Sequence, residues 1–150
     1  YIKLNRSHMY LTAIIDWCSR KIVGWNLSDT LGVQPVLEAV RSAVDRFGTP
    51  TILNSDQESQ FTSNEYEQLL KGLHIRQSMD GKSRWADNIM IERWFRSLKT
   101  ELIYINEFRS PRELRQSIRS YIDDYNRLRP HEALDYATPD AVYYASFRVA

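Results

Sequence analysis

The chain has 150 residues, of which 43% are hydrophobic and 26% are charged, and this is enough for one domain with a buried core. Its apolar runs are too short to cross a membrane, and its single cysteine excludes an internal disulfide and fits a reducing cytosol. The net charge of +1 does not by itself indicate a nucleic-acid binder. Composition therefore leaves enzymes and binding modules open.

The first 28 residues alternate between apolar and polar side chains, a period of two that is typical of strands. We expect strands at residues 2–4, 9–17 and 21–27, joined by turns at residues 5–8 and 18–20. Three short strands in succession predict an antiparallel meander.

Helices and short strands alternate through the rest of the chain. The expected elements are a helix from about 32 to 47, a strand at 51–53, a helix from 63 or 64 to 70, a strand at 73–77, a loop at 78–86, and helices at about 87–104, 110–128 and from 139. This order predicts a mixed α/β fold, in which an antiparallel start is followed by parallel crossovers. Ligand sites in such sheets collect at the carboxyl ends of the strands.

Asp56 occupies such a position, directly after the apolar strand expected at 51–53. It is a candidate functional carboxylate, and the alternative is that it caps the turn that follows. A second candidate, Glu92, lies on the helix expected at about 87–104, with thirty-five residues between the two. A strand-end aspartate and a helix glutamate so far apart in sequence converge only through the fold.

The helix around Glu92 has two distinct faces. Its polar face carries, at helical spacing, Asn88, Glu92, Arg96 and Lys99. Its apolar face is a core stripe of Ile91, Trp94, Phe95 and Leu98. A single carboxylate between an amide and two cations is unusual for a solvated helix, which more often alternates its charges in pairs. The alternative is a surface helix in which Glu92 forms a salt bridge with Arg96.

Charge is unevenly distributed along the chain. Residues 93–129 hold nine cations and five anions, although the whole chain has a net charge of only +1. Most of these cations lie in expected helices, so this third of the chain has a modest basic face that is compatible with phosphate contacts. The three histidines are scattered, with no spacing typical of a zinc site.

Several sequence blocks together resemble one known family. They are Tyr10-Leu11, Ile15-Asp16, Ser19-Arg20, Val23-Gly24-Trp25, Ser55-Asp56-Gln57, Ser59-Gln60-Phe61-Thr62-Ser63, Asp87-Asn88, Glu92, Leu98-Lys99, Glu101, Tyr121, Tyr125-Asn126, Arg129-Pro130-His131, Leu134 and Thr138-Pro139. Over nearly its whole length the chain resembles the catalytic core of bacterial insertion-sequence transposases, the DDE enzymes related to retroviral integrases. That resemblance implies a ribonuclease-H-like mixed sheet flanked by helices.

The resemblance also implies DNA strand cleavage and strand transfer by phosphoryl transfer. By motif position, Asp56 and Glu92 are catalytic residues and metal ligands, and Asn88, Arg96 and Lys99 match positions that contact the DNA end. The implied cofactor is Mg²⁺ or Mn²⁺, with two ions when the triad of carboxylates is complete. Carboxylates held close together repel one another, and hard cations with oxygen ligands neutralise that repulsion.

The chain departs from the family pattern in two places. Tyr1-Ile2 matches the continuation of the family's first aspartate motif, so we expect the first aspartate just before Tyr1 and a truncated first strand. Asp16 belongs to the motif of the second strand, and we do not assign it as a ligand. Glu58 stands where the family usually has glycine, so we expect its side chain to strain the turn and its charge to disturb metal or DNA binding. From the sequence, catalytic activity of this chain stays open.

Residues 1–150 are expected to form one catalytic core domain, with 131–150 as a C-terminal extension and the loop at 78–86 closing over DNA. The implied partner is DNA, as element ends and as target, and no membrane is expected. Because two DNA ends must be brought together, the active protein is expected to be a homo-oligomer in the bacterial cytoplasm, at the nucleoid. Two alternatives stay open: an inactive DNA-binding or oligomerisation remnant of a transposase, and another nuclease of this fold that acts on RNA–DNA hybrids or junctions.

Overall fold

The computed structural model describes residues 1–4, 7–79 and 88–146. The strands are β1 (Ile2–Leu4), β2 (Ser7–Ile15), β3 (Ile22–Ser28), β4 (Ile52–Ser55) and β5 (Arg76–Met79). The helices are α1 (Val33–Phe47), α2 (Asn64–Gly72), α3 (Ile89–Leu98), α4 (Pro111–Arg127) and α5 (Pro139–Ala145). A π-helical turn, η2 (Lys99–Ile103), continues α3, and a 3₁₀ turn, η3 (Glu132–Leu134), precedes α5.

The strands pair as the sequence predicts, with an antiparallel start and a parallel continuation. In the described part of the chain, β1, β2 and β3 form an antiparallel meander in that order, and β4 pairs with β5 in parallel. The register places Ala13 opposite Trp25 in the meander and Leu53 opposite Gln77 in the parallel pair. Parallel pairing puts the carboxyl ends of β4 and β5 at the same edge.

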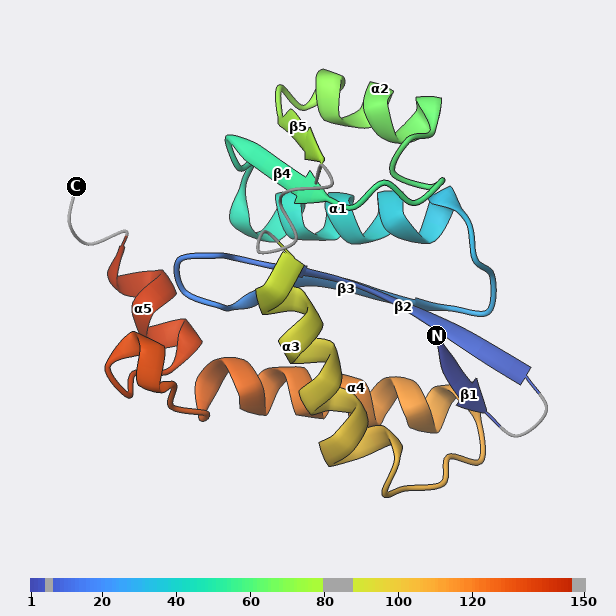
Figure 1. Ribbon diagram of the computed structural model, residues 1–150, viewed down its shortest axis with the longest axis vertical. Helices are drawn as coiled ribbons and strands as arrows, with labels where there is room; N and C mark the ends of the chain where they lie inside the picture. Colours follow the sequence, from blue (N-terminus) through green and yellow to red (C-terminus); the bar gives the residue numbers. More distant parts are fainter. Residues whose placement is uncertain (5–6, 80–87, 147–150) are drawn as a thin grey trace.

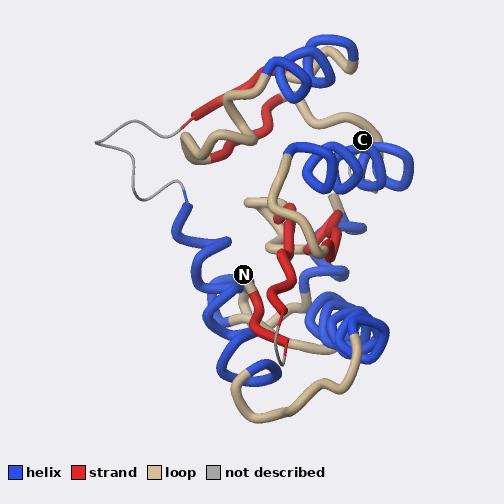
Figure 2. Tube along the Cα trace, turned by 90° about the vertical axis from the view of Figure 1, so that its right-hand side faces the viewer, coloured by secondary structure: helices blue, strands red, loops and turns tan. Residues whose placement is uncertain are grey.

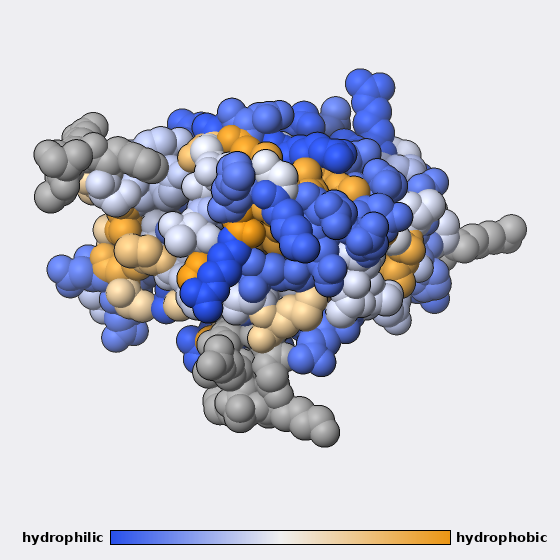
Figure 3. Space-filling view, turned by 90° about the horizontal axis from the view of Figure 1, so that it is seen from above, coloured by the Kyte–Doolittle hydropathy of each residue, from blue (hydrophilic) through white to orange (hydrophobic). Residues whose placement is uncertain are grey.

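Helices cover both faces of the β2–β3 hairpin (Figure 1). On one face, α3 and α4 enclose a core cluster that includes Trp94, Leu98 and three residues along α4, namely Leu114, Ile118 and Ile122. On the other face, α1 separates the hairpin from α2 and from β4 and β5 (Figure 1), and a second cluster forms around Val40, Tyr66 and Leu70. Each fully buried side chain of this kind stabilises the fold by about 1.5–3 kcal/mol relative to an exposed one. Seen from above, the outer face of the part formed by α2, β4 and β5 is mostly hydrophilic with small hydrophobic areas (Figure 3).

Of the two longest expected helices, α4 begins where capping chemistry predicts, and α3 begins at Ile89 without a side-chain hydrogen bond from its cap position Asn88. Ser110 caps α4 by accepting a hydrogen bond from the Glu113 N–H at 3.2 Å, with Pro111 in the first turn. Asn88 precedes α3, and the stripe predicted around Trp94 packs into the core. Beyond Leu98, however, the helix widens into η2, which the sequence pattern does not predict. The expected cap Asp87 lies outside the described residues.

The strand expected at 73–77 begins later in the structure, at Arg76. Leu73 still belongs to the end of α2, because its N–H donates to the Leu69 carbonyl, and His74 has a left-handed φ of 58°. The apolar run therefore ends a helix before β5 begins at Arg76. Ser78 and Met79, expected in a loop, belong to β5, and the rest of that loop lies outside the described residues. Among the residues that the structure describes, no helix is long and apolar enough to cross a membrane.

Candidate active site

Asp56 follows the last residue of β4 at the carboxyl edge of the parallel pair. Its side chain is half-buried, and its Oδ1 accepts the backbone N–H of Glu58 at 3.0 Å. Asp56 therefore does cap the turn that follows, as the alternative interpretation expected. The same contact uses Oδ1 and helps to fix the direction of the carboxylate, so capping does not conflict with a ligand role for this side chain.

Glu58 fits the turn without the strain that the sequence suggested. The described non-glycine residues with positive φ are Arg20, His74, Asp135 and Tyr136, so Glu58 does not need the left-handed conformation that favours glycine. Its Oε2 accepts a hydrogen bond from Gln60 Nε2 at 2.8 Å, and its backbone carbonyl accepts the Phe61 N–H at 3.0 Å. The concern about backbone strain at Glu58 is wrong, whereas the effect of its negative charge stays a prediction.

Glu92 lies in the first turn of α3 and is exposed. The first turn of α3 lies beside the carboxyl ends of β4 and β5 in two views at right angles (Figures 1 and 2). The fold thus brings the element that carries Glu92 to the strand end that carries Asp56. No charged partner competes for Glu92 in the described part of the chain, and the salt bridge to Arg96 that the surface-helix alternative requires is not formed there.

The three predicted DNA-contact residues extend along the same helix. Asn88 precedes α3, Arg96 is exposed one turn beyond Glu92, and Lys99 opens η2. Lys99 keeps α-helical backbone angles, with φ −65° and ψ −45°, although its carbonyl already accepts the wider hydrogen bond of η2 from the Tyr104 N–H. These positions therefore lie in line along a helix that starts at the carboxylate edge, which is a suitable arrangement for holding a phosphate backbone.

The start of β1 lies within electrostatic reach of these elements. Burial lowers the pKa of the amino group at Tyr1, Lys99 lowers it further, and Glu58 opposes the shift. The amino group at Tyr1 is thus within electrostatic range of Lys99, which follows α3, and of Glu58 in the turn after β4. These are the elements to which the sequence assigned the second and third carboxylates.

The donor chemistry at this edge suits a hard divalent cation. Carboxylate oxygens are the ligands that Mg²⁺ and Mn²⁺ prefer in proteins. Asp56 and Glu92 supply such oxygens, and neither is neutralised by an ion pair within the described ranges. No group of three potential metal-binding side chains occurs among the described residues, so the pair is an incomplete set as it stands.

Asp16 and Glu101, the other acidic residues in the family blocks, have structural partners. Asp16 closes the turn between β2 and β3, where its Oδ2 accepts the Ser19 N–H at 2.8 Å and the Ser19 hydroxyl at 2.7 Å. Glu101 lies on η2 and accepts hydrogen bonds from Tyr121 at 2.6 Å and Arg129 at 2.5 Å. These contacts agree with the expectation that neither residue is a metal ligand.

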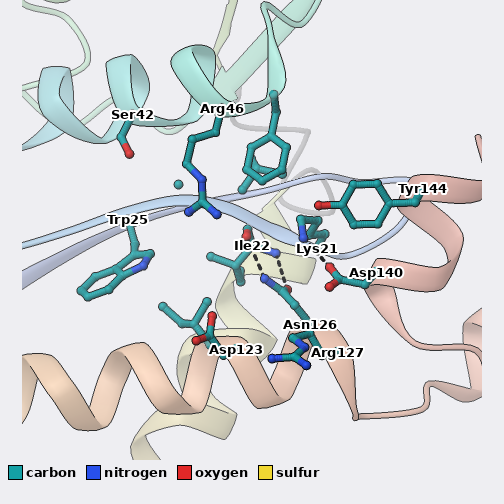
Figure 4. A pocket seen from close by; sticks show the side chains of 14 residues that line it. Lys21, Ile22, Trp25, Ser42, Arg46, Asp123, Asn126, Arg127, Asp140 and Tyr144 are labelled. Carbon is teal, nitrogen blue, oxygen red and sulfur yellow. Dashed lines mark hydrogen bonds and ion pairs between the residues drawn. The ribbon is translucent and has the colours of Figure 1, made fainter. Parts of the chain in front are cut away.

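A hollow of about 180 Å³ lies away from this site, between β3, α1, α4 and α5 (Figure 4). Arg46 points into it from α1, and Asn126 binds both the N–H and the carbonyl of Ile22 at its floor, at 2.9 and 3.0 Å. Lys21 forms an ion pair with Asp140 at its rim. Neither Asp56 nor Glu92 lines this hollow, so it is not the site of the predicted chemistry.

Sequence reasoning did not single out two buried hydroxyl groups behind Asp56. Ser55 is 7% exposed and Tyr66 is 1% exposed, and the Ser55 hydroxyl donates to the Asp56 carbonyl oxygen at 3.1 Å. Tyr66 has the spacing of an ordinary core residue of α2, and Ser55 looks like part of a short strand. A polar residue at the end of an apolar strand was the one available signal.

Solved structures with this arrangement of elements are retroviral integrases. The chain matches a chain of the simian T-cell lymphotropic virus intasome in complex with PP2A regulatory subunit B56 gamma, with a TM-score of 0.82 and 16% identity, over 95% of this chain and 51% of that one. It also matches the HTLV-2 integrase catalytic core domain in complex with magnesium (dimeric form), with a TM-score of 0.66 and 16% identity, over 95% and 88% of the two chains. These likenesses show the ribonuclease-H-like fold of integrase catalytic cores.

The family follows from the sequence itself. The model of the integrase core domain family matches residues 1–84, and a second model with the same description matches residues 73–139. The chain belongs to the integrase core domain family.

Two similar relatives are bacterial transposases. The transposase InsF for insertion sequence IS3A of Escherichia coli (strain K12) is 34% identical over 134 residues, which cover 87% of this chain and 46% of that protein. The transposase for insertion sequence element IS904 of Lactococcus lactis subsp. lactis (strain IL1403) is 36% identical over 142 residues, which cover 93% and 56%. The chain spans about half the length of these relatives.

Proposed function

We propose that this chain is the catalytic core of an insertion-sequence transposase that cuts and joins DNA strands by phosphoryl transfer. The observation that carries the proposal is the placement of Asp56 after β4 and Glu92 in the first turn of α3, at one edge of the fold. Family membership and the named transposase relatives support the same reaction.

Asp56 and Glu92 would hold a divalent cation, Mg²⁺ or Mn²⁺, and a pair of ions is expected once the carboxylate before Tyr1 is included. The HTLV-2 integrase core was solved with magnesium, which supports this choice of cofactor. When bound, such ions activate the attacking oxygen and stabilise the leaving oxygen of an in-line displacement. The Glu58 N–H contributes by holding the Asp56 carboxylate in a fixed direction.

DNA would approach along the polar face of α3. Arg96 and Lys99 would bind phosphates on either side of the scissile bond, and Asn88 would contact the DNA end next to the carboxylates. A water molecule first attacks the phosphorus at the element's end, which releases a 3′-hydroxyl. That hydroxyl would then attack a phosphodiester of the target strand, so that a new P–O bond to the element's 3′-oxygen forms while the bond to the target's own 3′-oxygen breaks and that oxygen leaves as a 3′-hydroxyl. The arginine and lysine would hold both backbones in place.

The active protein is proposed to work as an oligomer at the bacterial nucleoid. Two element ends must be joined to one target, which requires at least two active sites or one site used in succession. The dimeric form of the HTLV-2 core and the intasome of the simian virus support an oligomeric assembly for this fold.

The test is strand cleavage and strand transfer on labelled element ends, using protein extended upstream of Tyr1 to include the expected aspartate. Glu92→Gln is expected to lower the rate by about 10³-fold, because a lost metal ligand removes several kcal/mol of transition-state stabilisation. The control is Glu107→Gln, which removes an exposed carboxylate away from the site and should leave the rate unchanged. Wild-type rates in the Glu92 variant, or DNA binding with no metal-dependent cleavage in the parent protein, would contradict the proposal.

A further inference from the structure

A series of hydrogen bonds orders the segment between β4 and α2, which begins at Asp56. The Glu58 N–H donates to Asp56 Oδ1 at 3.0 Å, and the Phe61 N–H donates to the Glu58 carbonyl oxygen at 3.0 Å. Glu58 takes part in both contacts. The place of Phe61 therefore influences the place of Glu58, and through it the direction of the Asp56 carboxylate.

Gln77 of β5 holds this segment from outside. Its Nε2 donates to the Phe61 carbonyl oxygen at 2.8 Å, across sixteen residues of sequence. Gln77 pairs with Leu53 in the register of β4 and β5, and Leu53 packs against the second core cluster. Because paired residues of neighbouring strands share one face of a sheet, the half-buried Gln77 amide lies on the core-facing side. A polar group in that position needs a hydrogen-bond partner, and the Phe61 carbonyl is one.

Phe61 is held by its side chain as well as by its backbone. Its ring packs edge-on against Tyr66 of α2, with centroids 5.5 Å apart, and Tyr66 is 1% exposed. The Phe61 N–H is bonded within the segment, and its carbonyl is bonded to Gln77. A displacement of Phe61 therefore has to break ring packing or a hydrogen bond. This makes Phe61 a suitable point from which β5 can order the segment after Asp56.

The turn between β2 and β3 shows the difference that such a contact makes. There Asp16 accepts the N–H and the hydroxyl of Ser19, and the Asp16 N–H donates to the Lys21 carbonyl at 2.8 Å, so the turn is closed within itself. The segment after Asp56 leads into α2 instead, and its internal hydrogen bonds join residues at most three apart. The hydrogen bond from Gln77 adds a long-range restraint to this local network.

We propose that Gln77 is a positioning residue for Asp56, which acts through the Phe61 carbonyl and the Glu58 N–H to hold the Asp56 carboxylate where it binds a divalent cation. The inference rests on the proposed role of Asp56 as a metal ligand. Partners that orient a metal ligand commonly contribute about ten- to a hundred-fold to metal affinity. Because this route passes through two backbone contacts, we expect an effect at the lower end of that range.

The experiment measures Mn²⁺ affinity by electron paramagnetic resonance in protein extended upstream of Tyr1. Gln77→Met keeps the length of the side chain and removes the donor, and we expect it to weaken Mn²⁺ binding by about tenfold. The matched control is Arg115→Met, which removes another part-buried side-chain donor to a backbone carbonyl, that of Leu27, at 2.8 Å. Arg115 lies on α4, across the hairpin from β4 and β5 (Figure 1). The control should lower Tm and leave Mn²⁺ affinity unchanged.

A second measurement tests the route itself, by amide hydrogen exchange followed by NMR without metal. In Gln77→Met, the N–H groups of Glu58 and Phe61 should exchange about fivefold faster, the effect of losing one hydrogen bond. The internal control is the N–H of Ser19, which is bonded to Asp16 and should exchange at the parent rate.

Unchanged exchange at Glu58 and Phe61 would overturn the proposed route. Unchanged Mn²⁺ affinity in Gln77→Met, or equal losses of affinity in Gln77→Met and Arg115→Met, would overturn the positioning role.

A third variant, Asp56→Asn, separates this inference from the proposed function. If Asp56→Asn abolishes Mn²⁺ binding while Gln77→Met leaves it intact, the positioning role fails and the proposed function stands. If Asp56→Asn binds Mn²⁺ like the parent protein, the assignment of Asp56 as a ligand fails, and the inference fails with it.

Discussion

At the scale of single residues, Asp56 shows how a local hydrogen bond orients a side chain. Its Oδ1 accepts the Glu58 N–H at 3.0 Å and so caps the turn after β4. A turn cap and a metal ligand both require an acceptor held in one direction. The structure therefore confirms the capping interpretation, and the ligand interpretation stays a prediction that is compatible with it.

Lys99 provides a prediction at this scale. Lys99→Gln removes one cation from the proposed DNA path, so the slope of log Kd against log salt concentration should fall by about one, with weaker binding to every DNA sequence. Fluorescence anisotropy at about 50 to 200 mM salt measures this slope, because affinity that depends on phosphate contacts changes strongly over that range. Arg112→Gln, which removes an exposed cation in the first turn of α4, is the control. Identical slopes in the two variants would count against the path along α3.

At the scale of elements, α3 packs into the core through its central residues and continues into an irregular π-helical turn. Trp94 is 2% exposed, and its ring packs against Tyr121 and Tyr125 of α4, with centroids 6.4 Å away in both cases. Beyond Leu98 the turn widens, and the Tyr104 N–H donates to the Lys99 carbonyl, a spacing of five residues. Within this turn, Glu101 accepts a hydrogen bond from Arg129 at 2.5 Å. π-turns of this kind are frequent at functional sites.

The contact between β3 and α1 depends on a glycine. A Cβ added at Gly24 would lie 2.8 Å from both the Ala39 carbonyl oxygen and the Ala43 Cβ. Gly24→Ala should therefore lower the free energy of unfolding by about 1–3 kcal/mol, measured by urea denaturation. Gly72→Ala is the control, since its Cβ would meet nothing within 4 Å and should be neutral or slightly stabilising. Wild-type stability in the Gly24 variant would mean that the helix and strand are less tightly packed than described.

At the scale of the whole molecule, polar contacts connect the C-terminal segment to the rest of the fold. Glu101 of η2 binds Arg129 after α4, and the guanidinium of Arg129 lies over the ring of Tyr121 at 5.6 Å. On the opposite side, Lys21 pairs with Asp140 of α5 and lies over the ring of Tyr144 at 5.0 Å (Figure 4). Both contacts join segments more than twenty residues apart, so they order the chain after α4 relative to the core. The assignment of 131–150 as a separate extension stays a prediction.

The Glu101–Arg129 pair predicts a dependence of stability on pH. The hydrogen bond from Arg129 lowers the pKa of Glu101 below its ordinary value of 4.5, against the opposing effect of burial. Because the folded pKa is lowered, the pair stabilises the fold fully above pH 4.5 and loses this contribution as the pH falls through the folded value. With side chains 34% and 44% exposed, the contribution should be below about 1 kcal/mol.

The measurement compares the free energy of unfolding of Glu101→Gln and the parent protein at pH 7 and pH 3. The variant should be less stable at pH 7, and the difference should be smaller at pH 3, because the parent carboxylate loses its charge as the pH falls toward and through its lowered pKa. Glu107→Gln, which alters an exposed carboxylate, should show no difference at either pH. A deficit in Glu101→Gln that is undiminished at pH 3 would show that packing, and not charge, is what the substitution removes.

Local patterns determined the elements of this protein and much of its candidate site. The period-two start, the helical stripe around Trp94 and the capped start at Ser110 are set by neighbours within a few residues, and the structure confirms all three. The same local logic failed at Leu73, where an apolar run fits the end of a helix as well as a strand and only contacts with α2 decide between them.

Tertiary structure alone decided what lies behind and beside Asp56. The hydrogen bond from Arg129 to Glu101 and the approach of α3 to the end of β4 join segments distant in sequence. Periodicity indicates which side of an element faces the core, but it does not indicate which other element packs against that side. That choice depends on the packing of all helices against the hairpin at once, so the sequence by itself indicated the carboxylates, and the fold supplied their surroundings.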